Sequence, residues 1–190
     1  MISGSVLVVC GKAEYGDEIA ALMLHQGFSS AESALSANEA RRKLNSLEPD
    51  LLIVNTPLPD EQGKDFILDI AEKTDAGILV LAKHEYLDEM QDELEKVGAL
   101  ILPKPISRII LAQTARFADN MRKSIIGLKN QRDDLQKKMD ERKVIEKAKW
   151  LLVEKLSMTE PQANRYIQKR AMDLRLSQFK VAREIVHNYE

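Results

Sequence analysis

Lysine and arginine side chains crowd the last 49 residues of this sequence, where they are suited to bind phosphate. Residues 142–190 contain 11 Lys and Arg against 6 Asp and Glu, a net charge of +5. Small and apolar residues recur among them at helical spacing, which predicts three short helices that are apolar on one side and basic on the other. Such a surface suits a phosphate backbone. This end of the chain is therefore expected to bind a nucleic acid, with RNA favoured.

Side chains for catalysis do not come together in the same way. The three histidines, His25, His84 and His187, are scattered, and no nucleophile is paired with a base. No Cys, His or carboxylate cluster has the spacing of metal ligands. We therefore expect no enzyme activity, no cofactor and no metal.

Cysteine content and hydropathy indicate the compartment. The single cysteine, Cys10, cannot form an internal disulfide and fits a reducing cytosol. No apolar run reaches the roughly 18 residues of a membrane span, and the N-terminus lacks the pattern of a secretion signal. We expect a cytoplasmic protein that does not contact membranes.

Charge is distributed unevenly between the two parts of the chain. Residues 1–105 contain 9 Lys and Arg against 19 Asp and Glu, a net charge of −10. Residues 106–190 contain 19 against 11, a net charge of +8. Opposite signs in the two parts predict an acidic regulatory module joined to a module that binds a polyanion.

Short apolar runs alternate with helical periods through the acidic part, which predicts five parallel strands in a doubly wound α/β sheet. In such a sheet, binding sites lie at the carboxyl ends of the strands. The expected strands are Val6–Val9, Phe28–Ala34, Leu51–Val54, Ile78–Leu81 and Ala99–Leu102, and the expected helices between them cover about 14–26, 37–46, 64–73 and 86–97.

Four motifs accompany these strands: Pro49-Asp50-Leu-Leu-Ile-Val-Asn55, the Pro59-Asp60-x-x-Gly63 turn, Gly98-Ala99 and Lys104-Pro105. Together they resemble the receiver domain of response regulators, over about 105 residues and a following helix. The resemblance implies a flavodoxin-like fold. It also implies a site in which an aspartate after the third strand accepts phosphate, an acidic pair after the first strand holds Mg²⁺, and a Ser/Thr and a Lys complete the pocket.

This sequence departs from that pattern at almost every functional position. Asn55 stands at the phosphoacceptor position, Cys10 and Gly11 replace the acidic pair, and Ala82 replaces the hydroxyl residue, so that only Lys104 remains. An amide is not a carboxylate nucleophile, and phosphotransfer needs the metal that the acidic pair would hold. We therefore expect a pseudo-receiver that is not phosphorylated. Lys104 is expected to be solvated or bonded to Asn55 or a backbone carbonyl, rather than to contact a small ligand, and Cys10 to be buried.

Residues 106–155 contain no proline and one glycine, Gly127, which predicts a nearly continuous helix. A seam of apolar residues, interrupted by the weak positions Thr114 and Arg132, recurs in steps of three and four, as a two-stranded coiled coil requires, so a homodimer is expected. The alternative is an amphipathic helix packed against the receiver-like domain, which fits the part up to about Phe117. The expected dimer seam contains Ala118, Met121, Ile125, Leu128, Leu135 and Met139.

The tail carries a second set of motifs: Arg142-x-x-Ile145-x-x-Ala148-Lys149, Glu160-x-x-Ala163, Tyr166-Ile167, Arg170-Ala171-Met172 and Val181-Ala182-x-x-Ile185-Val186. They resemble the ANTAR domain of bacterial transcription antiterminators. The chain is thus expected to comprise a receiver-like domain (1–118), a coiled-coil linker (119–141) and an all-α three-helix ANTAR domain (142–190). Ala148, Ala163, Ala171 and Ala182 are expected to let helices approach closely, and Met172 to lie in the core. Thr159, with Pro161 in the first turn, is expected to cap the second helix and Ser177 the third.

The ANTAR resemblance implies a dimer that grips RNA stem-loops in mRNA leaders and so prevents a terminator hairpin from forming. Trp150 stands where the family usually has glycine, and it fits helix or dimer packing or base stacking. The expected RNA-binding residues are Lys147, Lys149, Lys155, Arg165, Tyr166, Lys169, Arg170 and Arg175, of which Tyr166 and Arg170 are candidates to stack on bases.

Two other functions remain open from the sequence. A short three-helix unit could be the helix-turn-helix of a DNA-binding atypical response regulator, although residues 174–177 lack a glycine. The pseudo-receiver could instead be an interaction module that docks a sequestering or sensor protein. Such a partner, or a small ligand, would then control the tail without phosphorylation.

Overall fold

The computed structural model describes residues 4–189. The chain divides into two compact units, Met1–Gly127 and Leu128–Glu190, and each has its own hydrophobic core. No helix in the described part of the chain is both long and apolar enough to span a membrane.

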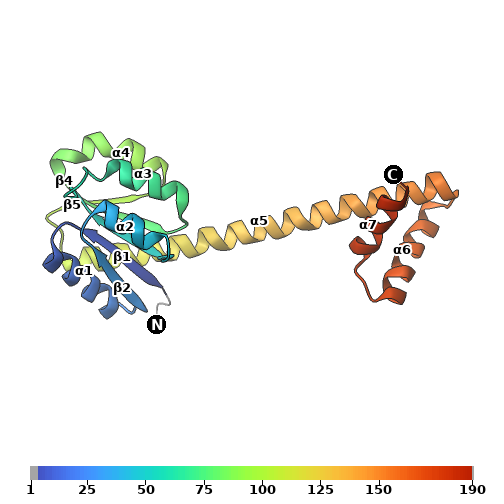
Figure 1. The fold of residues 1–190 in the computed structure, drawn as a ribbon, viewed down its shortest axis with the longest axis horizontal. Helices are drawn as coiled ribbons and strands as arrows, with labels where there is room; N and C mark the ends of the chain where they lie inside the picture. Colours follow the sequence, from blue (N-terminus) through green and yellow to red (C-terminus); the bar gives the residue numbers. More distant parts are fainter. Residues whose placement is uncertain (1–3, 190) are drawn as a thin grey trace. The chain divides into compact units, whose positions relative to one another are not determined.

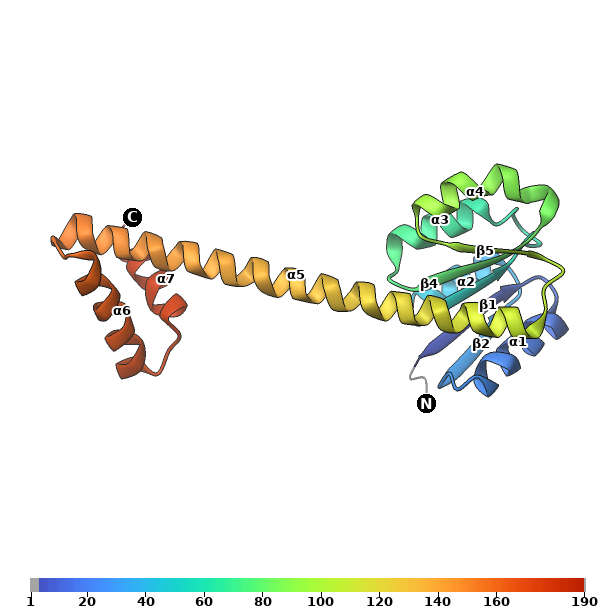
Figure 2. The same ribbon diagram turned by 180° about the vertical axis from the view of Figure 1, so that it is seen from behind.

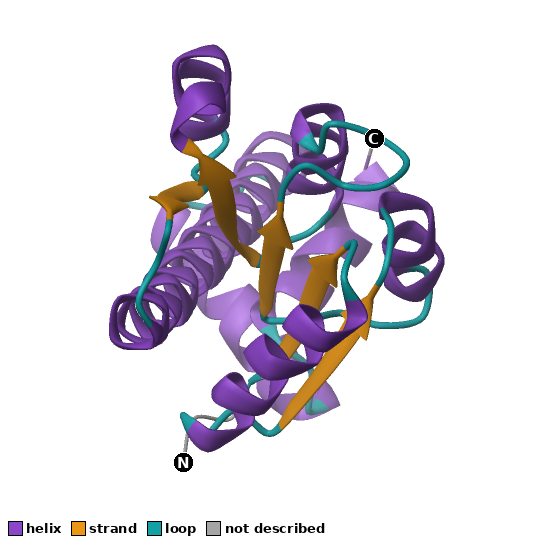
Figure 3. Ribbon diagram, turned by 90° about the vertical axis from the view of Figure 1, so that its left-hand side faces the viewer, coloured by secondary structure: helices purple, strands orange, loops and turns teal. Residues whose placement is uncertain are grey.

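The first unit is built on a parallel sheet of five strands in the order β2-β1-β3-β4-β5 (Figure 1). This order, with helices on both faces, confirms the expected doubly wound receiver-like fold. Figure 3 shows how the sheet twists between its covering helices. The strands are β1 (Ser5–Cys10), β2 (Ser30–Ala34), β3 (Leu51–Asn55), β4 (Gly77–Lys83) and β5 (Leu100–Lys104).

Helices cover both faces of the sheet because the central strands are apolar on both sides. Leu7 and Val9 pack with α2, α3 and α4, whereas Val6 and Val8 pack with α1 and α5. Continuous burial along β1 and β3 is typical of parallel strands. The covering helices are α1 (Ala13–His25), α2 (Ala37–Leu44), α3 (Lys64–Lys73), α4 (Leu87–Lys96) and α5 (Arg108–Leu156), with a short 3₁₀ helix, η1 (His84–Tyr86), before α4.

The start of α5 belongs to the first unit. Ala115 and Ala118 are buried in its core. The guanidinium of Arg122 forms an ion pair with Asp50, and its Nε donates to the Asp75 carbonyl at 2.9 Å. The packed part of α5 therefore extends past residue 118.

The burial of Ala118 corrects one expected member of the dimer seam. Ala118 is 4% exposed, and its carbonyl lies against Gly77. It therefore has no surface to offer a second chain. The neighbouring side chain on the outer face of α5 is Phe117, which is 55% exposed.

The second unit contains the end of α5 with α6 (Glu160–Leu174) and α7 (Gln178–Tyr189), which lie beside one another in Figure 2. Thr159 and Gln162 form a capping box at the start of α6, with Pro161 in the first turn. Ser177 Oγ accepts from the Lys180 N–H at 3.3 Å and so caps α7. Both caps agree with the sequence.

Small residues let the three helices of the second unit pack closely. The expected role of the four alanines is confirmed, because all of them lie in the core with apolar side chains from each helix. This core contains Ala148 and Leu152 of α5, Ala163, Ile167 and Ala171 of α6, and Val181, Ala182 and Ile185 of α7.

Candidate functional site

Four of the expected pocket residues of the first unit lie at or near the carboxyl ends of the strands. Cys10 ends β1 and is in register with Asn55, which ends β3. Ala82 lies in β4 opposite Pro103, one residue before Lys104. The fold therefore brings together Cys10, Asn55, Ala82 and Lys104, as expected from the sequence.

Asn55 and Cys10 contact each other directly. The Asn55 Nδ2 amide donates to Cys10 Sγ at 3.1 Å. The cysteine is 1% exposed and packs with the core beneath α1, which confirms that it is buried. Among the described residues, the buried Oδ1 of Asn55 has no hydrogen-bond partner.

Lys104 is held by the backbone. Its Nζ donates to the Thr56 carbonyl, which is one of the contacts expected from the sequence. Burial is the main cause that lowers the pKa of Lys104. The electrostatic interaction with Cys10 raises this pKa, and the positive charge of Lys83 lowers it, but both effects are smaller than that of burial. The remaining lysine of the pocket thus has a structural partner.

Gly11 faces a neighbour that leaves no room for a side chain. A Cβ at this position would lie 2.7 Å from Pro59 Cγ and 2.8 Å from Pro59 Cδ. Such contacts are far inside van der Waals distance, so an acidic residue at position 11 requires Pro59 to move. The geometry agrees with the loss of the acidic pair.

Asp60, the acidic residue of the Pro59–Gly63 turn, caps the N-terminal end of the neighbouring helix α2. Its carboxylate accepts from the N–H groups of Ala37 at 3.0 Å and Asn38 at 2.9 Å, at the start of α2. Burial opposes ionisation of Asp60, but these backbone hydrogen bonds outweigh it and lower the pKa. Among the side chains that the structure describes, those of residues 4–86 and 90–189, no group of three or more His, Cys, Asp or Glu is arranged to hold a metal ion.

In the second unit, the candidate nucleic-acid side chains of α6 divide between two faces. Arg165 lies at helical spacing with Gln168 and Met172, on one face. Tyr166 and Arg170 lie one turn apart on another face, where Arg170 Nη1 donates to the Tyr166 hydroxyl at 3.3 Å. Lys169 is exposed between these faces. The sequence did not separate these two groups.

The lysines near the end of α5 are partly engaged within the chain. The Lys149 side chain is 15% exposed and pairs with Glu146 at 2.7 Å. Lys155 lies 4.0 Å from Glu154, and Lys147 also interacts within the chain. Lys149 is therefore less available to phosphate than the exposed Arg165, Lys169 or Arg170.

Arg175 occupies an unusual backbone conformation. It ends α6 with φ 52° and ψ 37°, in the left-handed region where glycine is usual. Its N–H donates to the Met172 carbonyl at 3.2 Å. Position 175 therefore carries an arginine side chain although its backbone conformation favours glycine.

Met172 does not lie in the core, contrary to the sequence prediction. Its side chain is 79% exposed. Ala163, Ile167 and Ala171 define the buried face of α6, and the next residue points about 100° away from that face. Met172 instead borders a hollow with Gln168 and Gln178, three residues that we did not predict to form a site. The outward spacing of Arg165, Gln168 and Met172 could have indicated it.

An apolar stripe runs along the outer face of α5. The stripe excludes Ala118 but keeps the other expected seam residues, and Trp150 is also exposed, at 58%. No described side chain covers the middle of the stripe, since residues 127–140 are all exposed. The exposed seam residues are Met121, Ile125, Leu128, Leu135 and Met139.

Comparison with known proteins found one likeness over the end of the chain and another over nearly its whole length. The family model of the ANTAR domain matches residues 133–186. The transcriptional regulatory protein PdtaR of Mycobacterium tuberculosis is 29% identical over 181 residues, which cover 95% of this chain and 88% of PdtaR.

Solved structures support the fold of the first unit. A response regulator receiver domain protein from Clostridium thermocellum is 24% identical, with a TM-score of 0.57, covering 64% of this chain and 98% of that protein. NtrX from Brucella abortus, solved in complex with ATP, is 20% identical, with a TM-score of 0.60, covering 78% of this chain and 35% of NtrX. At these identities the likeness shows the receiver fold alone.

Proposed function

Because the chain joins a receiver fold to an ANTAR domain, we propose that it is a regulator of transcription antitermination that binds RNA. In this proposal a homodimer binds stem-loops in nascent mRNA and prevents an overlapping terminator hairpin from forming. The match to the ANTAR model is the observation that carries the proposal, and the likeness to PdtaR over nearly the whole chain supports it.

The exposed cations of the ANTAR domain supply the binding chemistry. Arg165, Lys169 and Arg170 project from a helix whose opposite side is buried in the core. Cations on such a surface release counterions from the RNA backbone, which drives association. An exposed Tyr166 beside Arg170 adds a ring and a guanidinium plane that can stack on unpaired bases.

The exposed stripe of α5 supports the dimer. Met121, Ile125, Leu128, Leu135 and Met139 are between 44% and 65% exposed in the single chain. Their steps of four, three, seven and four match the seam of a two-stranded coiled coil, which would remove these side chains from water. A second copy of the chain is therefore the proposed occupant.

Control of this regulator does not use phosphorylation, in our proposal. Asn55 lacks a carboxylate nucleophile, and Pro59 fills the space that a side chain at Gly11 would need. We assign the input of the pseudo-receiver to a sequestering or sensor protein, or to a small ligand. Incubation with acetyl phosphate and Mg²⁺ should leave both the mass of the protein and its RNA affinity unchanged.

A competition experiment tests the proposed function. The full-length chain should bind a labelled library of RNA hairpins, and duplex DNA of the same length should compete poorly. The double variant Lys169→Glu/Arg170→Glu should lose this binding while keeping its helicity. The control variant Lys96→Glu reverses an exposed cation at the end of α4 and should bind normally. Preferred binding of duplex DNA would favour the DNA-binding alternative and refute the RNA proposal.

A further inference from the structure

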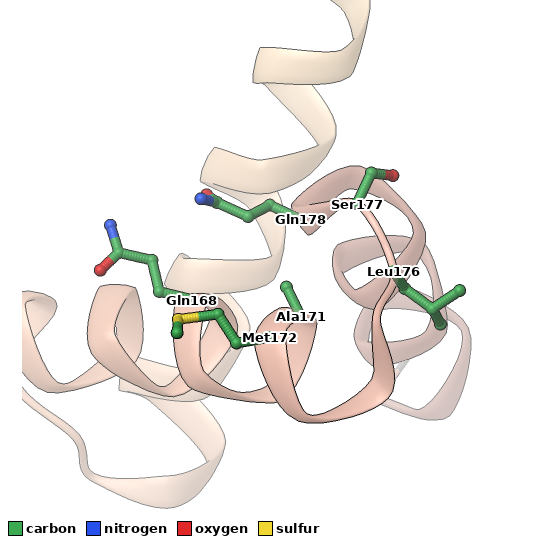
Figure 4. Close-up of a pocket in the computed structure, with 6 residues that line it drawn as sticks. All are labelled: Gln168, Ala171, Met172, Leu176, Ser177 and Gln178. Carbon is green, nitrogen blue, oxygen red and sulfur yellow. The ribbon is translucent and has the colours of Figure 1, made fainter.

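The turn between α6 and α7 borders a hollow of about 450 Å³ that is open to solvent. In Figure 4 the side chains of Gln168, Met172 and Gln178 extend to the same side of this corner, whereas Leu176 points away. The corner lies within one compact unit, so its geometry is set by the packing of α6 on α7. The lining residues are Gln168, Ala171, Met172, Leu176, Ser177 and Gln178.

The lining has the chemistry of a site for a neutral, flat molecule with polar edges. None of the six lining side chains is charged. The Met172 thioether and the Ala171 methyl offer an apolar, polarisable surface. Each of the Gln168 and Gln178 amides offers both a donor and an acceptor. Two donor–acceptor groups beside an apolar floor match the edge and face of a nucleobase better than they match a phosphate or a carboxylate.

Two arginines, one in α6 and one directly after it, lie close in sequence to lining residues without lining the hollow themselves. Arg165 lies on the same face of α6 as Gln168, about one turn away. Arg175 lies directly before Leu176 and adopts the left-handed conformation that glycine would adopt without steric cost. Two arginines close in sequence to a neutral hollow suit a nucleotide chain, in which phosphates lie beside each base.

From this arrangement we infer that the α6–α7 corner holds one unpaired base of an RNA hairpin loop. The inference rests on the proposed function and extends it from backbone contact and stacking to sequence reading. Phosphate contacts carry no sequence information, and stacking on Tyr166 and Arg170 tolerates any base. Unpaired loop bases can be read on their edges by amide side chains, and the two glutamines provide that reading here.

The test begins with a library of RNA hairpins that have one fixed stem and a randomised loop. The wild-type full-length chain should enrich one base at one loop position. An abasic nucleotide at that position should weaken binding on the order of tenfold, as expected for one good edge contact. Gln168→Ala, Met172→Ala and Gln178→Ala should each weaken binding of the intact hairpin. Each variant should then bind the abasic hairpin with an affinity only slightly lower than its affinity for the intact hairpin.

The matched control is Asn188→Ala, which removes an exposed amide from the far end of α7. It should keep the full sensitivity to the abasic nucleotide, and circular dichroism should show unchanged helicity for all variants. If the variant and abasic effects are additive, or if the wild type binds hairpins without any loop preference, the corner does not hold a base and the proposed function stands. If the wild type binds no hairpin RNA at all, the proposed function fails and this inference with it.

Discussion

At the scale of single residues, the side chains of the receiver pocket make structural contacts in place of the contacts that phosphotransfer needs. The Asn55 amide bonds to a buried thiol, Lys104 bonds to a backbone carbonyl, and Pro59 lies against Gly11. Each of these contacts uses a group or a space that phosphotransfer would require. The pocket is therefore a stable structural element that a single substitution does not convert back into a phosphate site.

Gly11→Asp should destabilise the first unit by about 1–3 kcal/mol, because the new side chain overlaps Pro59. Chemical denaturation followed by circular dichroism measures this loss. Gly127→Ala serves as the matched control, since a Cβ there meets open space in a helix, and it should stabilise the chain by about 0.5–1 kcal/mol. Unchanged stability of Gly11→Asp would show that Pro59 moves readily and that the acidic pair is not sterically blocked.

Asp60→Asn should reduce stability at neutral pH by about 1 kcal/mol, because the carboxylate accepts two N–H groups at the start of α2. The folded pKa of Asp60 is lowered from 3.8. Its contribution is therefore complete above that pH and is lost as the pH falls toward the folded pKa. The difference in stability between wild type and variant, measured by urea unfolding, should shrink below pH 3.8. A difference that is independent of pH would mean that the charge of Asp60 has no role.

At the scale of the elements, the sequence predicted the number and the direction of the strands because hydrophobic periodicity reports burial directly. It predicted the caps at Thr159 and Ser177 because Ser and Thr side chains accept backbone N–H groups at helix starts. It was wrong about Ala118 and Met172, since small and apolar residues fit either face of a helix. Only tertiary packing decides which face is covered, and the α6–α7 hollow depends entirely on that packing.

Leu135→Glu should convert the proposed dimer to a monomer. Leu135 is 62% exposed in the single chain, and its loss from a seam would remove about 1.5–3 kcal/mol of burial per chain. Sedimentation velocity measures the change. Asn130→Glu introduces the same charge about half a turn away from the seam and should leave the dimer intact. A wild-type chain that sediments as a monomer would rule out the seam.

At the scale of the whole molecule, charge is divided between the acidic residues 1–105 and the basic residues 106–190. Since a polyanion is attracted only by the basic part, its binding should depend on salt through that part alone. The separation leaves the acidic domain unattractive to RNA and available to another kind of partner.

Lys169→Ala should reduce the slope of log affinity against log salt for hairpin RNA by about 0.7–0.9, the effect of one phosphate contact. Lys12→Ala removes an exposed cation from the acidic part and should leave the slope unchanged. Filter binding over a salt series provides both slopes. Equal slopes for wild type and Lys169→Ala would exclude Lys169 from the RNA contact.

Trp150 is the only tryptophan of the chain and is 58% exposed on α5. Its indole is consequently a native fluorophore that responds to whatever covers that side of the helix. A blue shift of emission on raising protein concentration would signal self-association, whereas quenching on adding RNA would signal a stacked base. Tryptophan fluorescence alone thus distinguishes self-association from RNA binding, without any attached label.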